Sequence, residues 1–374
     1  MALKALGKIN KIEIYAIAIP FIRPFKIASG PYGDKAEYAL VRLQTSEGVE
    51  GWGEASPVPA FSKIGQEEVL KELNAVAELL KNQELNVNML HKRIRVLNTS
   101  ISSYALCGFE TAILDAIGKT LDIPIYQLLG GKVRNELELA WPIGLADVDH
   151  VLLEAKEAVD KGFKEIKLKV GEDLLKDIER IRAIREEFPS IEIRVDANQG
   201  YDRMTAIKAS EAFSRLGVRI FEQPVSKLDI EGLKAMRRCG MKVMADESCS
   251  SLEDAYTLLK AEAVDIINIK IMKYGGLKGA LEIASISKSA KIGNSLGSML
   301  ETGIGTAAGL HFAMICENIQ LRGEIVGPLF LEDDLLEDPL PYTSGKLLSL
   351  TKPGLGVEVN LKSLHEYGEL VNSF

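Results

Sequence analysis

The chain has 374 residues, of which 47% are hydrophobic and 26% are charged, the balance of a folded globular protein. A disordered or collagen-like chain is therefore excluded. The 45 Lys and Arg residues are outnumbered by 53 Asp and Glu residues, which leaves a net charge of −8. Such an acidic chain lacks the basic surface that binds nucleic acid or anionic membranes. We therefore expect neither of these as a partner.

Cysteine and histidine are too scattered in this sequence to suggest a metal or nucleophile site built on them. The four cysteines include no CxxC pair, which counts against a zinc knuckle and a disulfide framework. The four histidines do not stand at metal-ligand spacing, and we expect neither a histidine zinc site nor a Ser-His-Asp hydrolase. Because no run of about 18 apolar residues occurs, we expect a cytoplasmic protein with reduced thiols.

The N-terminal third of the chain is predicted to form a small antiparallel sheet followed by helices. Alternating patterns and a turn predict strands over Lys8–Ile19, Glu37–Gln44 and Val49–Glu54. Apolar residues at helical spacing predict helices over Gln66–Lys81, Met89–Leu97 and Ser103–Leu121. The last stretch, Glu332–Phe374, is expected to return to this N-terminal part.

The middle of the chain alternates short apolar runs with helix-length amphipathic segments, the pattern of repeated βα units and a parallel sheet. Eight strands are expected, over Leu137–Trp141, Glu165–Val170, Glu192–Asp196, Ile220–Glu222, Val243–Asp246, Ile266–Lys270, 291–299 and Ile319–Ile325. The helices between them include Asp147–Lys161, Leu174–Glu187, Met204–Leu216 and Leu252–Lys260. A closed (β/α) barrel fits this pattern, and an open doubly wound sheet fits it as well.

Three consecutive strands end in an acidic residue: Asp196, Glu222 and Asp246. In a barrel, side chains at the C-terminal ends of the strands converge on one mouth. Three carboxylates without a histidine or thiolate form a hard-oxygen ligand set, which suits Mg²⁺ and also accepts Mn²⁺. Any one of these acids alone would more often be a helix N-cap or part of a structural ion pair. Their succession predicts a divalent-cation site at the mouth.

Lysines end the strands on either side of the acidic series, with Lys169 before it and Lys270 after it. Lys167 precedes Lys169 by two residues, so a strand would point both side chains to the same side. A free lysine is too basic to act as a base near neutral pH, and we expect Lys167 and a metal ion to lower the lysine pKa. This set predicts proton abstraction next to a carboxylate, with one lysine addressing each face.

Three further polar residues near the strand ends allow more than one interpretation. Asn198 either orients Asp196 or caps the next helix. Glu301 either supports the site or lies in the first turn of a helix. Glu324 ends the eighth predicted strand and is expected to face the same mouth, where it pairs with Lys270 or contacts the substrate.

On these residues, the chain resembles the enolase superfamily, in its muconate-lactonizing-enzyme subgroup, over nearly its whole length. The motifs that carry the resemblance are Lys167-Leu168-Lys169, Asp196-Ala197-Asn198, Glu222-Gln223-Pro224, Asp246-Glu247-Ser248 and Lys270 followed by Gly275-Gly276. The resemblance implies an α/β fold with a modified (β/α)₇β TIM-type barrel at residues 133–330. It also implies an N-terminal α+β capping domain at residues 1–132, completed by the C-terminal segment 331–374.

The resemblance also implies the roles of individual residues. The three acids at the strand ends would hold one Mg²⁺ per subunit, with Lys169 and Lys270 as the acid/base pair. Lys167 would assist at the substrate carboxylate. The residues implied to bind substrate are Arg23, Phe25, Ser298, Met299 and Glu324, and those implied to support the site are Asn198, Glu247 and Glu301. Similar proteins commonly form dimers or rings, so a homo-oligomer is expected.

Substrate choice is expected to come from the cap and the late strands. The segments that resemble dipeptide epimerases are Arg23–Phe25, Gly53–Pro57 and Asn268–Lys273. Glu324 departs from the Asp-x-Asp that many such epimerases carry to hold an ammonium group. We expect epimerisation of an L,L-dipeptide through an enolate. The alternatives are a muconate cycloisomerase, an o-succinylbenzoate synthase or an N-acylamino acid racemase, and, outside the family, a Schiff-base aldolase or a non-catalytic binding barrel.

Overall fold

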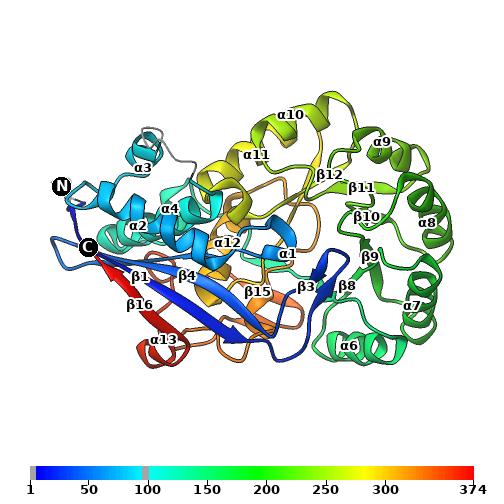
Figure 1. The fold of residues 1–374 in the computed structure, drawn as a ribbon, viewed down its shortest axis with the longest axis horizontal. Helices are drawn as coiled ribbons and strands as arrows, with labels where there is room; N and C mark the ends of the chain where they lie inside the picture. The colour runs from blue at the N-terminus through cyan, green and yellow to red at the C-terminus, as the bar shows by residue number, and fades with distance from the viewer. Residues whose placement is uncertain (1–5, 95–100) are drawn as a thin grey trace.

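The computed structural model describes residues 6–94 and 101–374, and an antiparallel sheet within it contains strands from both ends of the chain (Figure 1). The strands lie in the order β16-β1-β4-β5, with bounds Gly368–Ser373, Ile9–Pro20, Lys35–Thr45 and Glu50–Ala55. The three strands predicted in the N-terminal third are therefore confirmed. Because β16 pairs with β1, the C-terminal segment does return to the N-terminal part, as expected.

Helices α2 and α4 pack on this sheet, and α3 packs on α4. Their bounds are Gln66–Leu80 for α2, Val87–Ile94 for α3 and Ser103–Leu121 for α4. The predicted helix Met89–Leu97 corresponds to α3, and its last three residues lie outside the described part of the chain. Glycines let α4 approach β5 closely, because a Cβ at Gly53 would lie 1.9 Å from the carbonyl oxygen of Gly108. This approach brings α4 between the sheet and the barrel.

Parallel strands form the barrel in the order β13-β12-β11-β10-β9-β8-β7. Along the chain they are β7 (Trp141–Ile143), β8 (Glu165–Lys169), β9 (Glu192–Asp196), β10 (Ile220–Glu222), β11 (Lys242–Ala245), β12 (Ile266–Ile269) and β13 (Gly293–Leu296). The outer helices are α6 (Val148–Asp160), α7 (Leu174–Glu187), α8 (Arg203–Arg215), α9 (Ile230–Arg238), α10 (Leu252–Lys260), α11 (Leu277–Ser289) and α12 (Gly303–Ile315). Figure 1 shows α6 to α11 curving around the strands. Spatial order follows chain order without reversal, so the strands curl as in a barrel rather than forming a doubly wound sheet.

The prediction of the first barrel strand at Leu137–Trp141 is wrong in position. Residues Glu136–Glu138 form β6, which pairs antiparallel with β15 (Lys346–Leu348) of the C-terminal segment. The first strand of the parallel sheet begins at Trp141 instead of Leu137. The reason is a pairing between segments about two hundred residues apart, which the local pattern around Leu137 does not contain. The domain boundaries placed at residues 132 and 330 stay predictions.

The eighth predicted strand, Ile319–Ile325, is not a regular strand in the described structure. The segment closes the circle between β13 and β7 through single bridges, which pair Ile319 with Asn294 and Gly323 with Leu139. The amide of Glu324 donates to the carbonyl oxygen of Leu296 at 2.8 Å, on the β13 side. Residues Glu136–Glu138, which precede Leu139, form their ladder with β15 instead of with this segment.

Carboxylates of the cap region hold the N-termini of two barrel helices. Glu110 of α4 accepts the backbone N–H of Lys278 in α11 at 2.8 Å. Glu54 of β5 accepts the N–H groups of Thr302 and Gly305, at 3.0 and 2.8 Å, where α12 begins. The first N–H groups of a helix have no partner within the helix, and a carboxylate satisfies them and favours the helix dipole. These contacts fix the cap region against the barrel.

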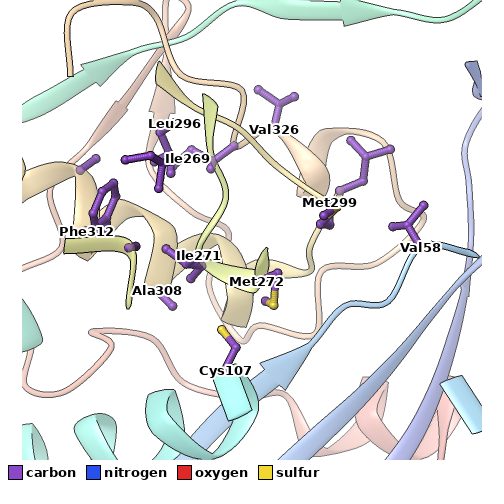
Figure 2. Close-up of a cluster of buried hydrophobic side chains, with 14 of the residues drawn as sticks. Val58, Cys107, Ile269, Ile271, Met272, Leu296, Met299, Ala308, Phe312 and Val326 are labelled. Atoms are coloured by element: carbon purple, nitrogen blue, oxygen red, sulfur yellow. The ribbon is translucent and has the colours of Figure 1, made fainter. Parts of the chain in front are cut away.

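Apolar packing joins the same two parts. Figure 2 shows Val58 and Cys107 from the cap region in one cluster with Met272, Ala308 and Phe312 from the barrel. Two short elements, the β2–β3 hairpin and α1, lie between the cap sheet and the barrel strands in Figure 1. Their bounds are Lys26–Ile27 for β2, Gly30–Pro31 for β3 and Pro59–Ser62 for α1. Among the described helices, none is long and apolar enough to span a membrane.

Candidate active site

The structure brings together the three acids that end successive strands. Asp196 is the last residue of β9, Glu222 the last of β10, and Asp246 follows β11 directly. All three are fully buried, and each offers an oxygen within 4.8 Å of the others. Parallel strands in register explain this, because Asp196 and Glu222 are direct partners across β9 and β10. The three residues are called the carboxylate triad below.

Two buried lysines contact different members of the carboxylate triad. Lys169 Nζ lies 2.6 Å from Asp196 Oδ2, and Lys270 Nζ lies 2.8 Å from Asp246 Oδ2. Lys169 ends β8 and Lys270 follows β12, so the two come from strands on either side of the triad. Their ammonium groups therefore reach the triad from opposite sides, the arrangement that the sequence predicted.

Lys167 lies among three carboxylates below the mouth. Its Nζ is 2.8 Å from Glu222, 3.0 Å from Asp196 and 2.8 Å from Glu324. Burial disfavours the charge of Lys167, but the three carboxylates outweigh burial and hold its pKa well above the ordinary value. Burial and the charge of Asp196 raise the pKa of Glu222 to about 7.

The protein's own groups do not lower the pKa of Lys270, contrary to the expectation from the sequence. Burial is the largest single effect and lowers this pKa, but the charge and hydrogen bond of Asp246 together with the charge of Tyr32 outweigh it, so the pKa of Lys270 lies above its ordinary value. Asp246 itself is buried, yet Lys270 and Lys273 hold its pKa below the ordinary value. The two groups therefore stabilise each other as an ion pair.

Two residues that hold the carboxylate triad in place were missed in the sequence. Lys273 Nζ donates to Asp246 Oδ1 at 2.8 Å, to the carbonyl oxygen of Asp246 at 2.9 Å and to that of Asn268 at 3.0 Å. Asn268 Nδ2 donates to Glu222 Oε1 at 2.8 Å. A 3-10 turn, η1 (Ile271–Tyr274), folds the chain after Lys270 so that Lys273 points back at Asp246. Both residues lie close to Lys270 in the sequence, and this closeness is the signal that could have identified them.

Asn198 orients the site rather than capping a helix. Its backbone N–H donates to Asp196 Oδ1 at 2.9 Å, and its side chain links Lys169, at 2.9 Å, to Glu247, at 3.1 Å. Helix α8 is capped by Asp202 instead. Burial and the charge of Asp246 raise the pKa of Glu247 to about 8. Asn198 and Glu247 thus form an outer layer behind the lysine and the triad.

Glu324 does not pair with Lys270, which corrects one of its two predicted contacts. Its Oε2 lies 2.8 Å from Lys167 and its Oε1 lies 2.9 Å from Arg194. The physical reason is position: the segment of Glu324 bridges β13 and the chain just before β7, from where Glu324 reaches Lys167 of β8, whereas Lys270 is held by Asp246 on the far side of the triad. Both carboxylate oxygens of Glu324 are therefore engaged by cations of the protein.

The loop after β13 carries Ser298, Met299 and Glu301. Glu301 accepts the backbone N–H of Met299 at 3.0 Å and the hydroxyl of Ser298. It stands just before α12, whose N-cap is Thr302, so Glu301 is not in the first turn of the helix. Burial raises the pKa of Glu301. The carboxylate therefore sets the shape of this loop.

Arg23 and Phe25 contact the barrel wall instead of the triad or the lysines. Arg23 donates to Glu157 of α6 at 2.7 Å and lies over the ring of Trp141, 5.8 Å from its centre. Phe25 is buried and packs edge-on to Phe330. These contacts anchor the β2–β3 hairpin to the barrel.

Aromatic residues of the cap region cover the lysine side of the site. The ring centre of Phe61, in α1, lies 4.1 Å from Lys270 Nζ, a cation–π distance. Beside the covering loops is a cavity of about 70 Å³, lined in part by Tyr32, Val58 and Met299. Only 6% of Lys169 and 4% of Lys270 are exposed, so both lysines are largely shielded from bulk water.

One sequence pattern in the chain matches a hydrolase motif. Residues Gly293–Gly297 read Gly-Asn-Ser-Leu-Gly, which matches the nucleophile elbow of serine hydrolases. In the structure Ser295 lies inside strand β13 instead of in a strand-to-helix turn. It is buried, and its hydroxyl donates to the carbonyl oxygen of Arg322 at 3.4 Å. A hydrolase site is therefore not formed at Ser295.

Comparison with known proteins matches both parts of the chain to one family. Residues 11–130 match the mandelate racemase / muconate lactonizing enzyme N-terminal domain, and residues 150–363 match the enolase C-terminal domain-like family. An N-succinyl-L-Arg/Lys racemase of Bacillus cereus is 32% identical, covering 96% of this chain and 97% of that protein. An L-Ala-D/L-Glu epimerase of Bacillus subtilis is 34% identical, covering 94% of this chain and 96% of that protein.

A solved structure agrees with these matches. The muconate lactonizing enzyme of Pseudomonas fluorescens, complexed with muconolactone, superposes with a TM-score of 0.93 at 32% identity, covering 97% of this chain and all of that one. The named relatives are isomerases that include a racemase, an epimerase and a lactonizing enzyme. The chain therefore belongs to the muconate-lactonizing-enzyme subgroup of the enolase superfamily and is an isomerase of that family.

Proposed function

We propose that this enzyme epimerises a small carboxylate substrate by moving a proton on and off the carbon next to the carboxylate. The observation that carries the proposal is the pair of buried lysines, Lys169 and Lys270, bonded to opposite members of one carboxylate triad. A lysine on each side allows the proton to leave from one face and return on the other. A cycloisomerase needs a lysine on one side only.

The carboxylate triad is the proposed site of one Mg²⁺ per subunit, or of Mn²⁺. Three buried carboxylate oxygens within 4.8 Å of one another, without nitrogen or sulfur, are the donors that these ions prefer. When bound, the ion would neutralise negative charge that develops on the substrate carboxylate. The residues that would hold it are Asp196, Glu222 and Asp246, with Lys273 and Asn268 fixing their orientation.

The chain's own groups carry the proton. The lysine that starts neutral takes the α-proton on its Nζ, and the electron pair left on carbon moves into the carboxylate as an enolate. The lysine that starts protonated then donates to the opposite face, so the two exchange protonation states in each turnover. Lys167 would stabilise the charge on the carboxylate, and the aromatic cover over Lys270 would exclude water.

For the substrate, we propose an L,L-dipeptide as the first class to test. Support comes from Arg23–Phe25, Gly53–Pro57 and Asn268–Lys273, which resemble dipeptide epimerases, and from the named B. subtilis relative. The second candidate is an N-acylated amino acid. It is favoured because both oxygens of Glu324 are already paired with Lys167 and Arg194, which leaves no free carboxylate there for a substrate ammonium group.

The test is α-proton exchange in deuterated water, followed by mass spectrometry. Wild-type enzyme with Mg²⁺ is offered a dipeptide library, a set of N-acylated amino acids and a muconate. Lys169→Gln and Lys270→Gln should each abolish epimerisation, and each should still exchange the proton of only one epimer. Exchange that survives both substitutions would contradict the proposal. Lactone formation from the muconate without exchange at other substrates would assign a cycloisomerase.

The same preparations separate the reactions outside the family. Activity that survives excess chelator, together with trapping by borohydride, would assign a Schiff-base aldolase. Absence of any Mg²⁺ binding in calorimetry would support a non-catalytic barrel. We further propose a cytoplasmic location, which the free cysteines of the described chain support. The homo-oligomer stays a prediction that sedimentation would test.

A further inference from the structure

Charged side chains fill one side of the barrel from the mouth downward, where barrels usually carry branched apolar residues. Glu165, Lys167 and Lys169 alternate along β8, so all three point the same way, and all three are buried. On β9, Arg194 is the register partner of Lys167, and Asp196 is the partner of Lys169. These residues, with Glu324 and Arg322, are called the charge column below.

Arg194 connects the middle of the charge column. Its guanidinium reaches Glu324 Oε1 at 2.9 Å and Glu165 Oε1 at 3.0 Å. Glu324 in turn reaches Lys167 with its other oxygen, at 2.8 Å. Arg194 is only 1% exposed, so these charges interact with little screening by water. The lower end of the column is closed by Arg322, which lies 3.1 Å from Glu165.

Glu324 differs from the other partners of Lys167 in one respect. Asp196 and Glu222 belong to the carboxylate triad, so a divalent cation on the triad would compete with Lys167 for their oxygens. The cation would also repel the ammonium group of Lys167. In the part of the chain that the structure describes, Glu324 is the one ion-pair partner of Lys167 outside the triad. The ion pair between Glu324 and Lys167 therefore contributes most to the position of Lys167 when the triad carries a cation.

Glu324 could not supply this hold without Arg194. A buried carboxylate is costly unless it is paired, and Lys167 is shared among three carboxylates. Arg194 pairs with the second oxygen of Glu324 and fixes the carboxylate between two cations. With Arg194 removed, Glu324 would either turn toward the vacated space or draw Lys167 away from the triad.

We propose that Arg194 is a positioning residue, which holds Glu324 and through it keeps Lys167 beside the carboxylate triad. The inference rests on the proposed function, in which Lys167 acts at the substrate carboxylate. Arg194 touches neither the triad nor the two flanking lysines through an ion pair in the described structure. Its effect on the reaction is therefore expected to pass chiefly through Lys167.

A double-mutant cycle tests this directly. Arg194→Met is expected to lower kcat/KM for α-proton exchange by about 10–100-fold, the usual effect of a removed outer partner. Arg194→Lys keeps a charge and should recover part of the loss. Lys167→Met combined with Arg194→Met should be no slower than Lys167→Met alone, because the first substitution removes the group through which Arg194 acts.

Arg180 is the matched control. It is a buried arginine of α7 that pairs with Asp177, outside the charge column. Arg180→Met should lose thermal stability without a special coupling to Lys167→Met. Losses from Arg194→Met and Lys167→Met that multiply, or an unchanged kcat/KM in Arg194→Met, would overturn the proposal.

One further variant and a crystal structure keep the proposal testable on other grounds. If Arg194→Met does not fold, Arg194→Met combined with Glu165→Gln removes a charge pair together, which is better tolerated. In a crystal structure of the folded variant, Lys167 Nζ should leave Asp196 or Glu222, or Glu324 should turn away from Lys167. Unchanged positions would overturn the positioning role. This readout holds even if wild-type enzyme exchanges no proton, a result that would count against the proposed function alone.

Discussion

Lys273 donates to two oxygens of Asp246, the backbone carbonyl at 2.9 Å and Oδ1 at 2.8 Å. The other carboxylate oxygen, Oδ2, accepts from Lys270. Asp246 is thus held by a lysine on each side, and among the described residues Lys273 alone binds both its main chain and its side chain. This relationship fixes the direction of one member of the carboxylate triad before any ligand arrives.

Lys273→Met is therefore expected to weaken Mg²⁺ binding by about 10–100-fold, the range for residues that orient a metal ligand. The methionine fills the space but removes the donor of Asp246 Oδ1 and one donor each from the carbonyl oxygens of Asp246 and Asn268. Titration calorimetry with MgCl₂ measures the change. The control is Lys288→Met, an exposed lysine paired with Glu317 on the surface, which should bind Mg²⁺ as wild type does. Equal affinities in the two variants would show that Lys273 has no part in the site.

Phe61→Leu tests the aromatic cover over Lys270. The ring centre lies 4.1 Å from Lys270 Nζ, and a cation–π contact of this kind contributes about 0.5–2 kcal/mol. Leucine keeps an apolar cover and removes the π face, so exchange catalysed from the Lys270 side should slow by about 2–30-fold. Phe61→Tyr retains the ring and serves as the control. A rate for Phe61→Leu equal to that of wild type would argue that the ring only excludes water.

Glu54→Gln should loosen the contact between the cap region and the barrel. The carboxylate is fully buried and accepts the N–H groups of Thr302 and Gly305 at the start of α12. An amide carries donors as well as an acceptor, so one buried donor would be left unpaired, at about 1–3 kcal/mol. Thermal unfolding should show a lower Tm. Glu67→Gln, at an exposed glutamate of α2, should leave Tm unchanged, and a similar Tm for both variants would contradict this role for Glu54.

The lowered pKa of His311 leads us to expect a loss of stability in mild acid. Burial lowers its pKa to about 4, and the neutral ring accepts from the Tyr126 N–H at 3.3 Å and donates to the Leu355 carbonyl oxygen at 2.9 Å. Below pH 6.5 the unfolded chain gains a proton at this residue that the folded chain does not take up. The free energy of unfolding should therefore fall as pH drops from 6.5 to 4, and His311 should account for about 2 kcal/mol between pH 7 and pH 5.

Urea unfolding at pH 7 and pH 5 measures the effect in wild type and His311→Gln. The variant should have a smaller difference between the two pH values, because its amide does not titrate. His365→Gln, at an exposed histidine, should keep the wild-type difference. If His311→Gln keeps the wild-type difference as well, other groups produce the acid sensitivity.

Local patterns were sufficient for most elements and for the central site. The apolar spacing of Leu174–Glu187 and Leu252–Lys260 predicts α7 and α10 to the residue, because helical periodicity is complete within such a segment. Acids at the ends of β9 and β10 predict the convergence of Asp196 and Glu222, since parallel strands in register carry their ends to one mouth. Pairing between distant segments was not predictable in this way.

The sequence alone determined the alternation of strands and helices, the residue types at the strand ends and, through them, a buried carboxylate triad between two lysines. Only the tertiary structure decided which partner each charge takes. Glu324 pairs with Lys167 and Arg194 instead of Lys270. Lys273 donates to Asp246, and β6 pairs with β15 of the C-terminal segment. The reason is physical: a buried charge pairs with the nearest opposite charge in space, and that distance is set by the packing of strands far apart in the chain.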